Sequence, residues 1–193
     1  MNHLYPIFLK LHELNVLIVG GGFVGTEKLQ FILKSSPEAQ VRVVSKEFCS
    51  QFLELALEAK NVTLIEDSYH EKYLAGKHLV IGATDDKNVN LQIRNEAKER
   101  FLLVNVADTP ELCDFYLGGI VTKGNLKVAI STNGKSPTAA KRIRQLLEEV
   151  LPEEFDDLLD NLNAYRATLK GDFEYKVKAM NEVTEELVRK VEV

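Results

Sequence analysis

The feature that most constrains the fold is the alternation of short apolar runs with longer helical patterns up to Val106. Five runs rich in β-branched residues predict strands over Asn15–Val19, Gln40–Ser45, Val62–Glu66, His78–Ala83 and Leu102–Val106. Between them, apolar residues recur every three to four positions and predict helices over Phe23–Lys34, Phe48–Lys60 and Asn88–Arg100. Strands joined through helices pair in parallel with right-handed crossovers, so the sequence predicts an α/β fold built on a parallel sheet.

The pattern changes after this region. Two β-like runs, Gly119–Lys123 and Leu126–Ser131, are separated by Gly124-Asn125, a dipeptide typical of two-residue hairpin turns. Ser136-Pro137 follows and suits the N-cap and first turn of a helix that runs to about Leu151. The sequence therefore predicts a β-hairpin followed by a helix.

The rest of the chain is a helical tail, which Gly171 is expected to divide into two helices. Beyond residue 150 there are 6 basic and 11 acidic residues, which accounts for the whole formal net charge of −5. No segment carries the basic surplus that binding to phosphate backbones requires, so we expect no nucleic-acid partner.

Composition indicates where the protein is located and whether it binds a membrane or a metal. Hydrophobic residues make up 45% of the chain, yet the apolar runs are too short to span a membrane, and no leader segment is evident. Cys49 and Cys113 fit neither a disulfide framework nor a metal-binding spacing, and the four histidines are scattered. We expect a cytoplasmic protein with no membrane partner and no permanent metal site.

A glycine motif marks the end of the first predicted strand. Gly20, Gly22 and Gly25 form G-x-G-x-x-G between a strand and a helix, where the glycines permit a tight turn, phosphate approach and close helix packing. A glycine-rich turn without a ligand is the alternative, but strand, helix and second strand all stand in the order the motif needs. The cofactor-binding residues expected here are Gly20, Gly22, Phe23, Val24 and Gly25. The domain is therefore expected to be a Rossmann-type dinucleotide-binding domain.

The choice between NAD and NADP depends on the end of the second predicted strand, at Ser45, Lys46 and Glu47. NAD-binding domains usually place a carboxylate at this strand end, where it binds the ribose hydroxyl. Here Glu47 lies two residues further on, and Lys46 is either a ligand for a 2′-phosphate or a solvated loop lysine. We expect NAD as the cofactor, with NADP still open.

Several segments, in this order, resemble the siroheme synthase N-terminal family of precorrin-2 dehydrogenases and sirohydrochlorin ferrochelatases. They are Leu4–Leu11, Val19–Gly25 with Lys28, Ala83–Asp86 with Asn90, Val104–Asp108 with Pro110, Cys113–Phe115 and Ala129–Pro137. Together they cover most of residues 4–151, and within them Thr84 is expected to contact the cofactor.

The resemblance implies NAD-dependent oxidation of precorrin-2, a tetrapyrrole, to sirohydrochlorin in siroheme biosynthesis. In some members iron insertion follows, with Fe²⁺ as a substrate. The resemblance also implies a homodimer in which the hairpin module contributes to the subunit contact. We therefore expect three parts: an NAD(P)-binding Rossmann domain over residues 1–113, a hairpin-plus-helix dimerisation module over 114–150, and a helical tail over 151–193.

The candidate catalytic residue is Asp108, which lies just beyond the fifth predicted strand, at the sheet edge where ligands of such folds bind. Dehydrogenation needs a base for the proton that leaves with the hydride, and a carboxylate suits this role. The alternative is that Asp108 has a structural role only and caps the turn formed by Asp108, Thr109 and Pro110. Lys135 and Ser136, at a predicted helix start, are candidate ligands for the carboxylates of the tetrapyrrole.

A second class of function remains on the sequence alone. A dinucleotide-sensing regulatory domain would share the glycine motif but perform no catalysis, because the fold by itself does not fix function. Such a domain would bind the nucleotide and ignore tetrapyrroles.

Overall fold

The computed structural model describes residues 2–188, which divide into two compact units. The first unit comprises the chain up to Gly119 together with Ile130–Ala140. The second comprises Ile120–Ala129 and the chain from Lys141 onward. The three-part division expected from the sequence stays a prediction.

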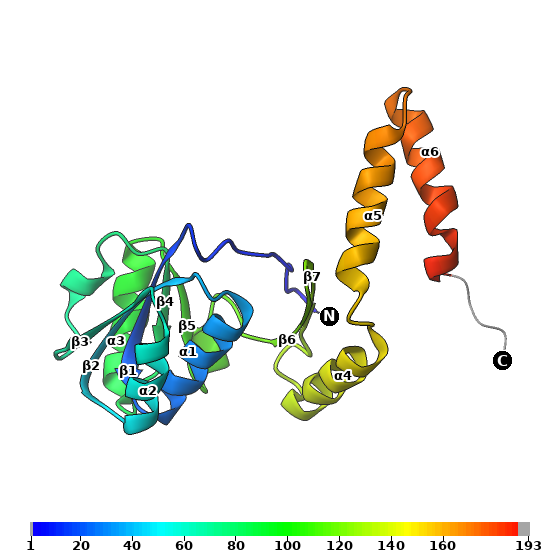
Figure 1. Ribbon diagram of the computed structural model, residues 1–193. Helices are drawn as coiled ribbons and strands as arrows, with labels where there is room; N and C mark the ends of the chain where they lie inside the picture. Colours follow the sequence, from blue (N-terminus) through cyan, green and yellow to red (C-terminus); the bar gives the residue numbers. More distant parts are fainter. Residues whose placement is uncertain (1, 189–193) are drawn as a thin grey trace. The chain divides into compact units, whose positions relative to one another are not determined.

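A five-stranded parallel sheet forms the centre of the first unit (Figure 1). Its order is β3-β2-β1-β4-β5, and the strands are β1 (Asn15–Gly21), β2 (Gln40–Phe48), β3 (Val62–Glu66), β4 (Leu79–Gly82) and β5 (Leu103–Val106). The chain adds strands outward from β1 on one side and then crosses to β4 on the other. Because the order reverses at β1, the carboxyl ends of β1 and β4 form the crevice at which such folds bind ligands.

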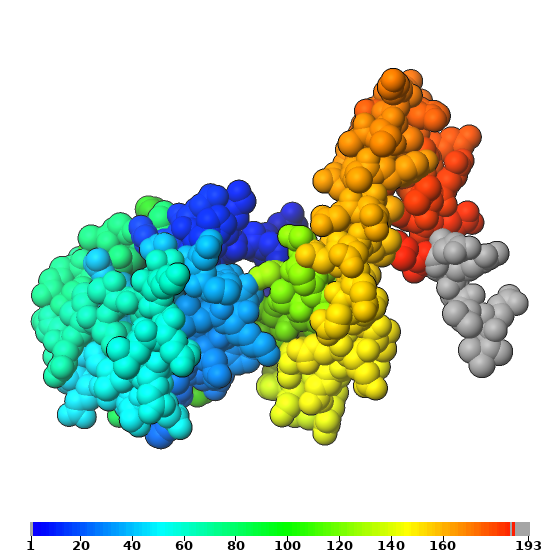
Figure 2. All heavy atoms as spheres, viewed as in Figure 1, coloured from blue at the N-terminus to red at the C-terminus, as the bar shows by residue number. Residues whose placement is uncertain are grey.

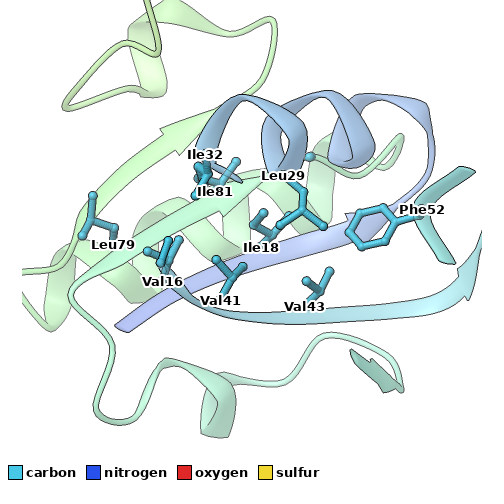
Figure 3. Packing of buried hydrophobic residues seen from close by; sticks show 11 residues of the cluster. Val16, Ile18, Leu29, Ile32, Val41, Val43, Phe52, Leu79 and Ile81 are labelled. Atoms are coloured by element: carbon cyan, nitrogen blue, oxygen red, sulfur yellow. The ribbon is translucent and has the colours of Figure 1, made fainter. Parts of the chain in front are cut away.

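Helices cover both faces of this sheet (Figure 1). On one face α1 (Phe23–Ser35) and α2 (Ser50–Glu58) pack through side chains that include Leu29 and Phe52 (Figure 3). On the other face lie α3 (Lys87–Glu99) and the short 3₁₀ helix η1 (Glu71–Leu74), which link β4 to β5 and β3 to β4. Strands buried on both faces read as continuous apolar runs, which explains why they stand out in the sequence.

One predicted strand end is wrong by three residues. β2 was expected to end at Ser45 but continues to Phe48, because the pairing with β1 shifts between Val19 and Gly21. Val19 pairs with Val44, whereas Gly21 pairs with Phe48, so extra residues of β2 bulge at this point. Bulges of this kind redirect side chains beside ligand sites and leave little trace in the hydrophobic pattern.

The remaining elements match the sequence prediction closely. A 3₁₀ turn, η2 (Pro110–Leu112), follows β5, and the hairpin consists of β6 (Gly119–Lys123) and β7 (Leu126–Ile130). The helix α4 (Pro137–Val150) begins one residue after Ser136, whose Oγ accepts a hydrogen bond from Ala139 N at 3.1 Å. The predicted N-cap is therefore confirmed.

In the second unit α5 (Phe155–Thr168) and α6 (Phe173–Thr184) form an antiparallel pair, as expected from Gly171, and a short 3₁₀ turn, η3 (Glu185–Val188), follows (Figure 1). Figure 2 shows the two helices, in orange and red, in contact near the turn that joins them. Asp156 anchors α5 to the hairpin, since its Oδ1 accepts from Asn125 N at 2.7 Å and Asn125 Nδ2 at 2.8 Å. Among residues 2–188, no helix combines the length and the apolar character needed to cross a membrane.

Candidate dinucleotide-binding site

The glycine loop between β1 and α1 has the geometry that the motif predicts. Gly20 has a φ of +116°, a conformation that side chains disfavour, and a Cβ there would lie 2.4 Å from Ala83 O. A Cβ on Gly25 would lie 2.1 Å from Gly20 O, so the third glycine lets α1 pack directly on the end of β1. Both positions require glycine for reasons within the protein itself.

Gly22 differs, because no protein atom lies within 4 Å of the position its Cβ would take. Its φ of −85° and ψ of −167° suit any residue, so neither strain nor packing calls for glycine. Gly22 is also the N-cap of α1 and provides no side-chain cap, which leaves the first-turn N–H groups of Phe23, Val24 and Gly25 without a side-chain acceptor among the described residues. Open space beside free donors at the positive end of a helix fits a bound pyrophosphate.

The bulge of β2 brings the three residues predicted for cofactor selection beside this loop. The Ser45 Oγ accepts a hydrogen bond from Gly21 N at 2.9 Å and donates one to Glu47 O at 2.6 Å. Ser45 is thus engaged in holding the glycine loop, while the side chains of Lys46 and Glu47 are exposed. Two acidic residues lie alongside: Glu66, the last residue of β3, is in register with Ser45, and Asp67, which follows the strand, donates its N–H to Ser45 O at 3.0 Å.

Thr84 follows β4 and faces the glycine loop through its backbone, since a Cβ on Gly20 would lie 3.0 Å from Thr84 N. The side chain of Asn90, in the first turn of α3, binds Thr84 through both its oxygen and its nitrogen. Sequence reasoning did not place Asn90 in the site. Two signals were available: Asn90 belongs to one of the segments that carry the family resemblance, and it lies in the buried stripe of α3, three and seven residues before the apolar Ile93 and Ala97.

Asp108 lies two residues beyond β5, at the same edge of the sheet as the glycine loop. Its backbone has a φ of +57°, and hydrogen bonds on either side hold it there: Ala107 N donates to Gly82 O at 2.9 Å and Thr109 N to Val106 O at 3.3 Å. The Asp108 side chain is exposed and makes no hydrogen bond or ion pair with any residue from 2 to 188. The side chain therefore caps no turn among the described residues, although its left-handed φ is one that aspartate adopts more readily than most residues, and the catalytic role of Asp108 stays a prediction.

The segment after Asp108 forms hydrogen bonds with the outer edge of β5. The Asp114 carboxylate accepts a hydrogen bond from Val104 N at 3.1 Å and forms an ion pair with Lys98 Nζ at 3.1 Å. Cys113 Sγ accepts from Val106 N at 3.3 Å, and burial raises the pKa of this thiol. Cys113 therefore has a structural role, and it fixes the backbone that carries Asp108.

The second cysteine, Cys49, lies directly behind the glycine loop. It is the N-cap of α2, its N–H donates to Gly21 O at 2.9 Å, and its Sγ lies 3.4 Å from Thr26 Oγ1. The hydrogen bond with Thr26 lowers the pKa of the thiol, against the effect of burial. Both cysteines are free, as the sequence predicts.

Lys135 and Ser136 lie on a tight loop at the start of α4. Asn133 and Gly134 have left-handed φ values of +55° and +74°, which turn the chain so that Lys135 projects from the surface. Thr132 Oγ1 accepts from Ser136 N at 3.2 Å and stabilises the turn. No group of three or more histidine, cysteine, aspartate or glutamate side chains among the described residues could hold a metal ion.

Comparison with known proteins identifies the family. Residues 7–119 match the family described as "Putative NAD(P)-binding", and residues 123–149 match the one described as "Sirohaem biosynthesis protein central". The chain belongs to the siroheme synthase N-terminal family. Its domain is an NAD(P)-binding Rossmann domain joined to the central sirohaem domain, as the resemblance implied.

Individual relatives agree with this assignment. Siroheme synthases of Pseudoalteromonas translucida and Psychrobacter cryohalolentis are 40% and 35% identical over 90% and 91% of this chain, which spans 34% and 31% of their lengths. The fold resembles that of SirC, a precorrin-2 dehydrogenase, with a TM-score of 0.76 and 24% identity over 95% of this chain and 90% of SirC.

Proposed function

We propose that this chain catalyses the NAD-dependent oxidation of precorrin-2 to sirohydrochlorin. The observation that carries the proposal is that Asp108 presents an exposed carboxylate, with no partner among the described residues, at the sheet edge where the glycine loop leaves open space over Gly22. The open space over Gly22 suits a bound dinucleotide, and the Asp108 carboxylate suits a base. Both lie at the carboxyl edge of the same sheet. Membership of the siroheme synthase N-terminal family supplies the substrate class.

The residues divide the chemistry between them. Bound NAD⁺ would supply the hydride acceptor of the reaction. The Asp108 carboxylate would accept the proton that leaves precorrin-2 with the hydride, so that two electrons and two hydrogens are removed in all.

For the cofactor we propose NAD in preference to NADP. Next to Ser45 the carboxylates of Glu47 and Glu66 outnumber the exposed ammonium of Lys46, while the Asp67 carboxylate is paired with Lys72. A 2′-phosphate brought to this corner would face net negative charge, whereas a ribose hydroxyl would find acceptors. Titration with NAD and NADP by isothermal calorimetry tests this, and equal dissociation constants would contradict it.

The tetrapyrrole would bind through its peripheral carboxylates. Lys135 supplies an exposed ammonium, and Ser136, although its oxygen caps α4, retains its hydroxyl proton as a donor. The homodimer that the resemblance implies and the cytoplasmic location expected from composition remain predictions, which analytical ultracentrifugation and cell fractionation would test. Iron insertion into sirohydrochlorin, with Fe²⁺ as a substrate, also remains a prediction.

The decisive experiment is an anaerobic assay of precorrin-2 oxidation with NAD⁺, comparing the wild type with Asp108→Asn and Asp108→Ala. We expect both variants to fold and bind NAD while turnover falls by about 10²-fold or more, which is the usual contribution of a general base. Wild-type binding of NAD without any precorrin-2 oxidation would refute the enzyme and favour the dinucleotide-sensing domain. A fully active Asp108→Ala would refute the role of Asp108 alone.

A further inference from the structure

Asn90 is a buried polar residue that the chemistry above does not use. It lies in the first turn of α3 and is only 7% exposed, in a stripe otherwise formed by apolar residues such as Ile93 and Ala97. Burying a carboxamide in such a position costs free energy unless its hydrogen bonds are made. The partners of its hydrogen bonds therefore indicate what Asn90 does.

The hydrogen bonds that the Asn90 side chain makes with residues 2–188 all go to Thr84. Its Oδ1 accepts from Thr84 Oγ1 at 2.8 Å and from Thr84 N at 3.3 Å, and its Nδ2 donates to Thr84 O at 2.9 Å. One carboxamide thus pairs both the N–H and the C=O of Thr84, as a neighbouring strand would. It does so two residues beyond the end of β4, where Thr84 has left the regular sheet.

The peptide held in this way forms one wall of the glycine loop. Ala83 N donates to Val19 O at 2.8 Å, and a Cβ on Gly20 would lie 2.4 Å from Ala83 O and 3.0 Å from Thr84 N. The path of the chain at Gly20 is therefore set by contact with the Ala83–Thr84 peptide. Any shift of that peptide would be passed to the loop that receives the dinucleotide.

We propose that Asn90 is a positioning residue for dinucleotide binding. Its carboxamide holds the Ala83–Thr84 peptide against Gly20, and so keeps the glycine loop in its binding geometry before the ligand arrives. The role deepens the proposed function and depends on it only for the ligand, NAD. Because Asn90 acts through Thr84, it touches no reacting atom.

The expected effect follows from preorganisation. Without the carboxamide, the N–H and C=O of Thr84 lose their partner, and binding must first restore an ordered loop. We expect Asn90→Ala to raise the dissociation constant for NAD by about tenfold, which corresponds to about 1.4 kcal/mol. In precorrin-2 oxidation the KM for NAD⁺ should rise while kcat stays near that of the wild type, since the bound state is the same.

Asn90→Asp provides a readout that a purely structural role would not produce. A neutral carboxyl has the shape of the carboxamide and can donate to Thr84 O, whereas the ionised form cannot. Burial favours the neutral form and raises the pKa of the introduced carboxyl. The affinity of this variant for NAD should therefore recover toward that of the wild type as the pH falls, at a constant folded fraction.

The test measures NAD binding by calorimetry across pH for the wild type, Asn90→Ala, Asn90→Asp and the control Asn88→Ala. Asn88 is exposed in the same turn of α3, and its side chain makes no hydrogen bond with a described residue. Circular dichroism at each pH establishes the folded fraction. If Asn90→Ala does not fold, the pH dependence of NAD binding by Asn90→Asp still tests the proposal.

The proposal is supported by weakened binding in the Asn90 variants, a normal Asn88→Ala, and recovery of Asn90→Asp at low pH. It is overturned if folded Asn90→Ala binds NAD within about twofold of the wild type, or if the affinity of Asn90→Asp shows no pH dependence beyond that of the wild type. Failure of the wild type to bind NAD, or to oxidise precorrin-2 once bound, would instead count against the proposed function.

Discussion

Replacing Gly22 by alanine should weaken dinucleotide binding and leave the stability of the fold nearly unchanged. The structure places no atom within 4 Å of the new Cβ, and the backbone at φ −85° and ψ −167° accepts alanine without strain. Alanine is a poorer N-cap than glycine, but it also restricts the unfolded chain, and each effect amounts to a few tenths to about 1 kcal/mol with opposite sign. We expect the free energy of unfolding to change by less than about 0.5 kcal/mol.

Dinucleotide binding should respond in the opposite way. A methyl group at Gly22 would occupy the space through which a pyrophosphate approaches the first turn of α1, so the phosphates would lose hydrogen bonds to the free N–H groups. Hydrogen bonds to charged groups contribute about 1.5–3 kcal/mol each. The loss of one therefore predicts a dissociation constant for NAD that is roughly tenfold to hundredfold higher.

Urea denaturation and NAD calorimetry on the same preparations test both halves of this prediction. Gly25→Ala is the matched comparison, since its Cβ would lie 2.1 Å from Gly20 O and must displace α1. That variant should lose about 1–3 kcal/mol of stability, as overpacked cores do. Wild-type affinity for NAD in Gly22→Ala would refute the assignment of the open space to the pyrophosphate.

Three further predictions concern stability and reactivity. Phe101 is 95% exposed in a left-handed conformation with φ +56°, so Phe101→Gly should raise the free energy of unfolding by about 1 kcal/mol in urea; a loss of stability would contradict this. Because the pKa of Cys49 is lowered and that of Cys113 raised, iodoacetamide should label Cys49 first at neutral pH by mass spectrometry, and the reverse order would count against this. Asp156→Ala should lower the free energy of unfolding by about 1 kcal/mol, because the hydrogen bonds to Asn125 are lost. Thermal unfolding tests this, and an unchanged midpoint would show that these hydrogen bonds do not stabilise the protein.

Local sequence signals predicted most of the secondary structure. Strand β3 occupies Val62–Glu66 as expected, and the hairpin turn lies at Gly124-Asn125, where Gly124 has a φ of +53°. These elements are encoded by residues close together in the chain: apolar periodicity, turn dipeptides and cap residues. The β2 bulge could not be predicted because it lies in the pairing of β2 with β1, where Gly21 N donates to Ser45 Oγ, and the two residues belong to different strands.

The sequence by itself determined that the chain would form a parallel sheet with a glycine loop, since the spacing of Gly20, Gly22 and Gly25 after an apolar run allows little else. Only the tertiary structure decided which polar groups are free and which are engaged. Within residues 2–188 it leaves the carboxylate of Asp108 without a partner, and it joins Thr84 to Asn90 by hydrogen bonds. The physical reason is that hydrogen-bond partners meet across strands and helices remote in sequence, so the availability of a side chain depends on packing that no local pattern records.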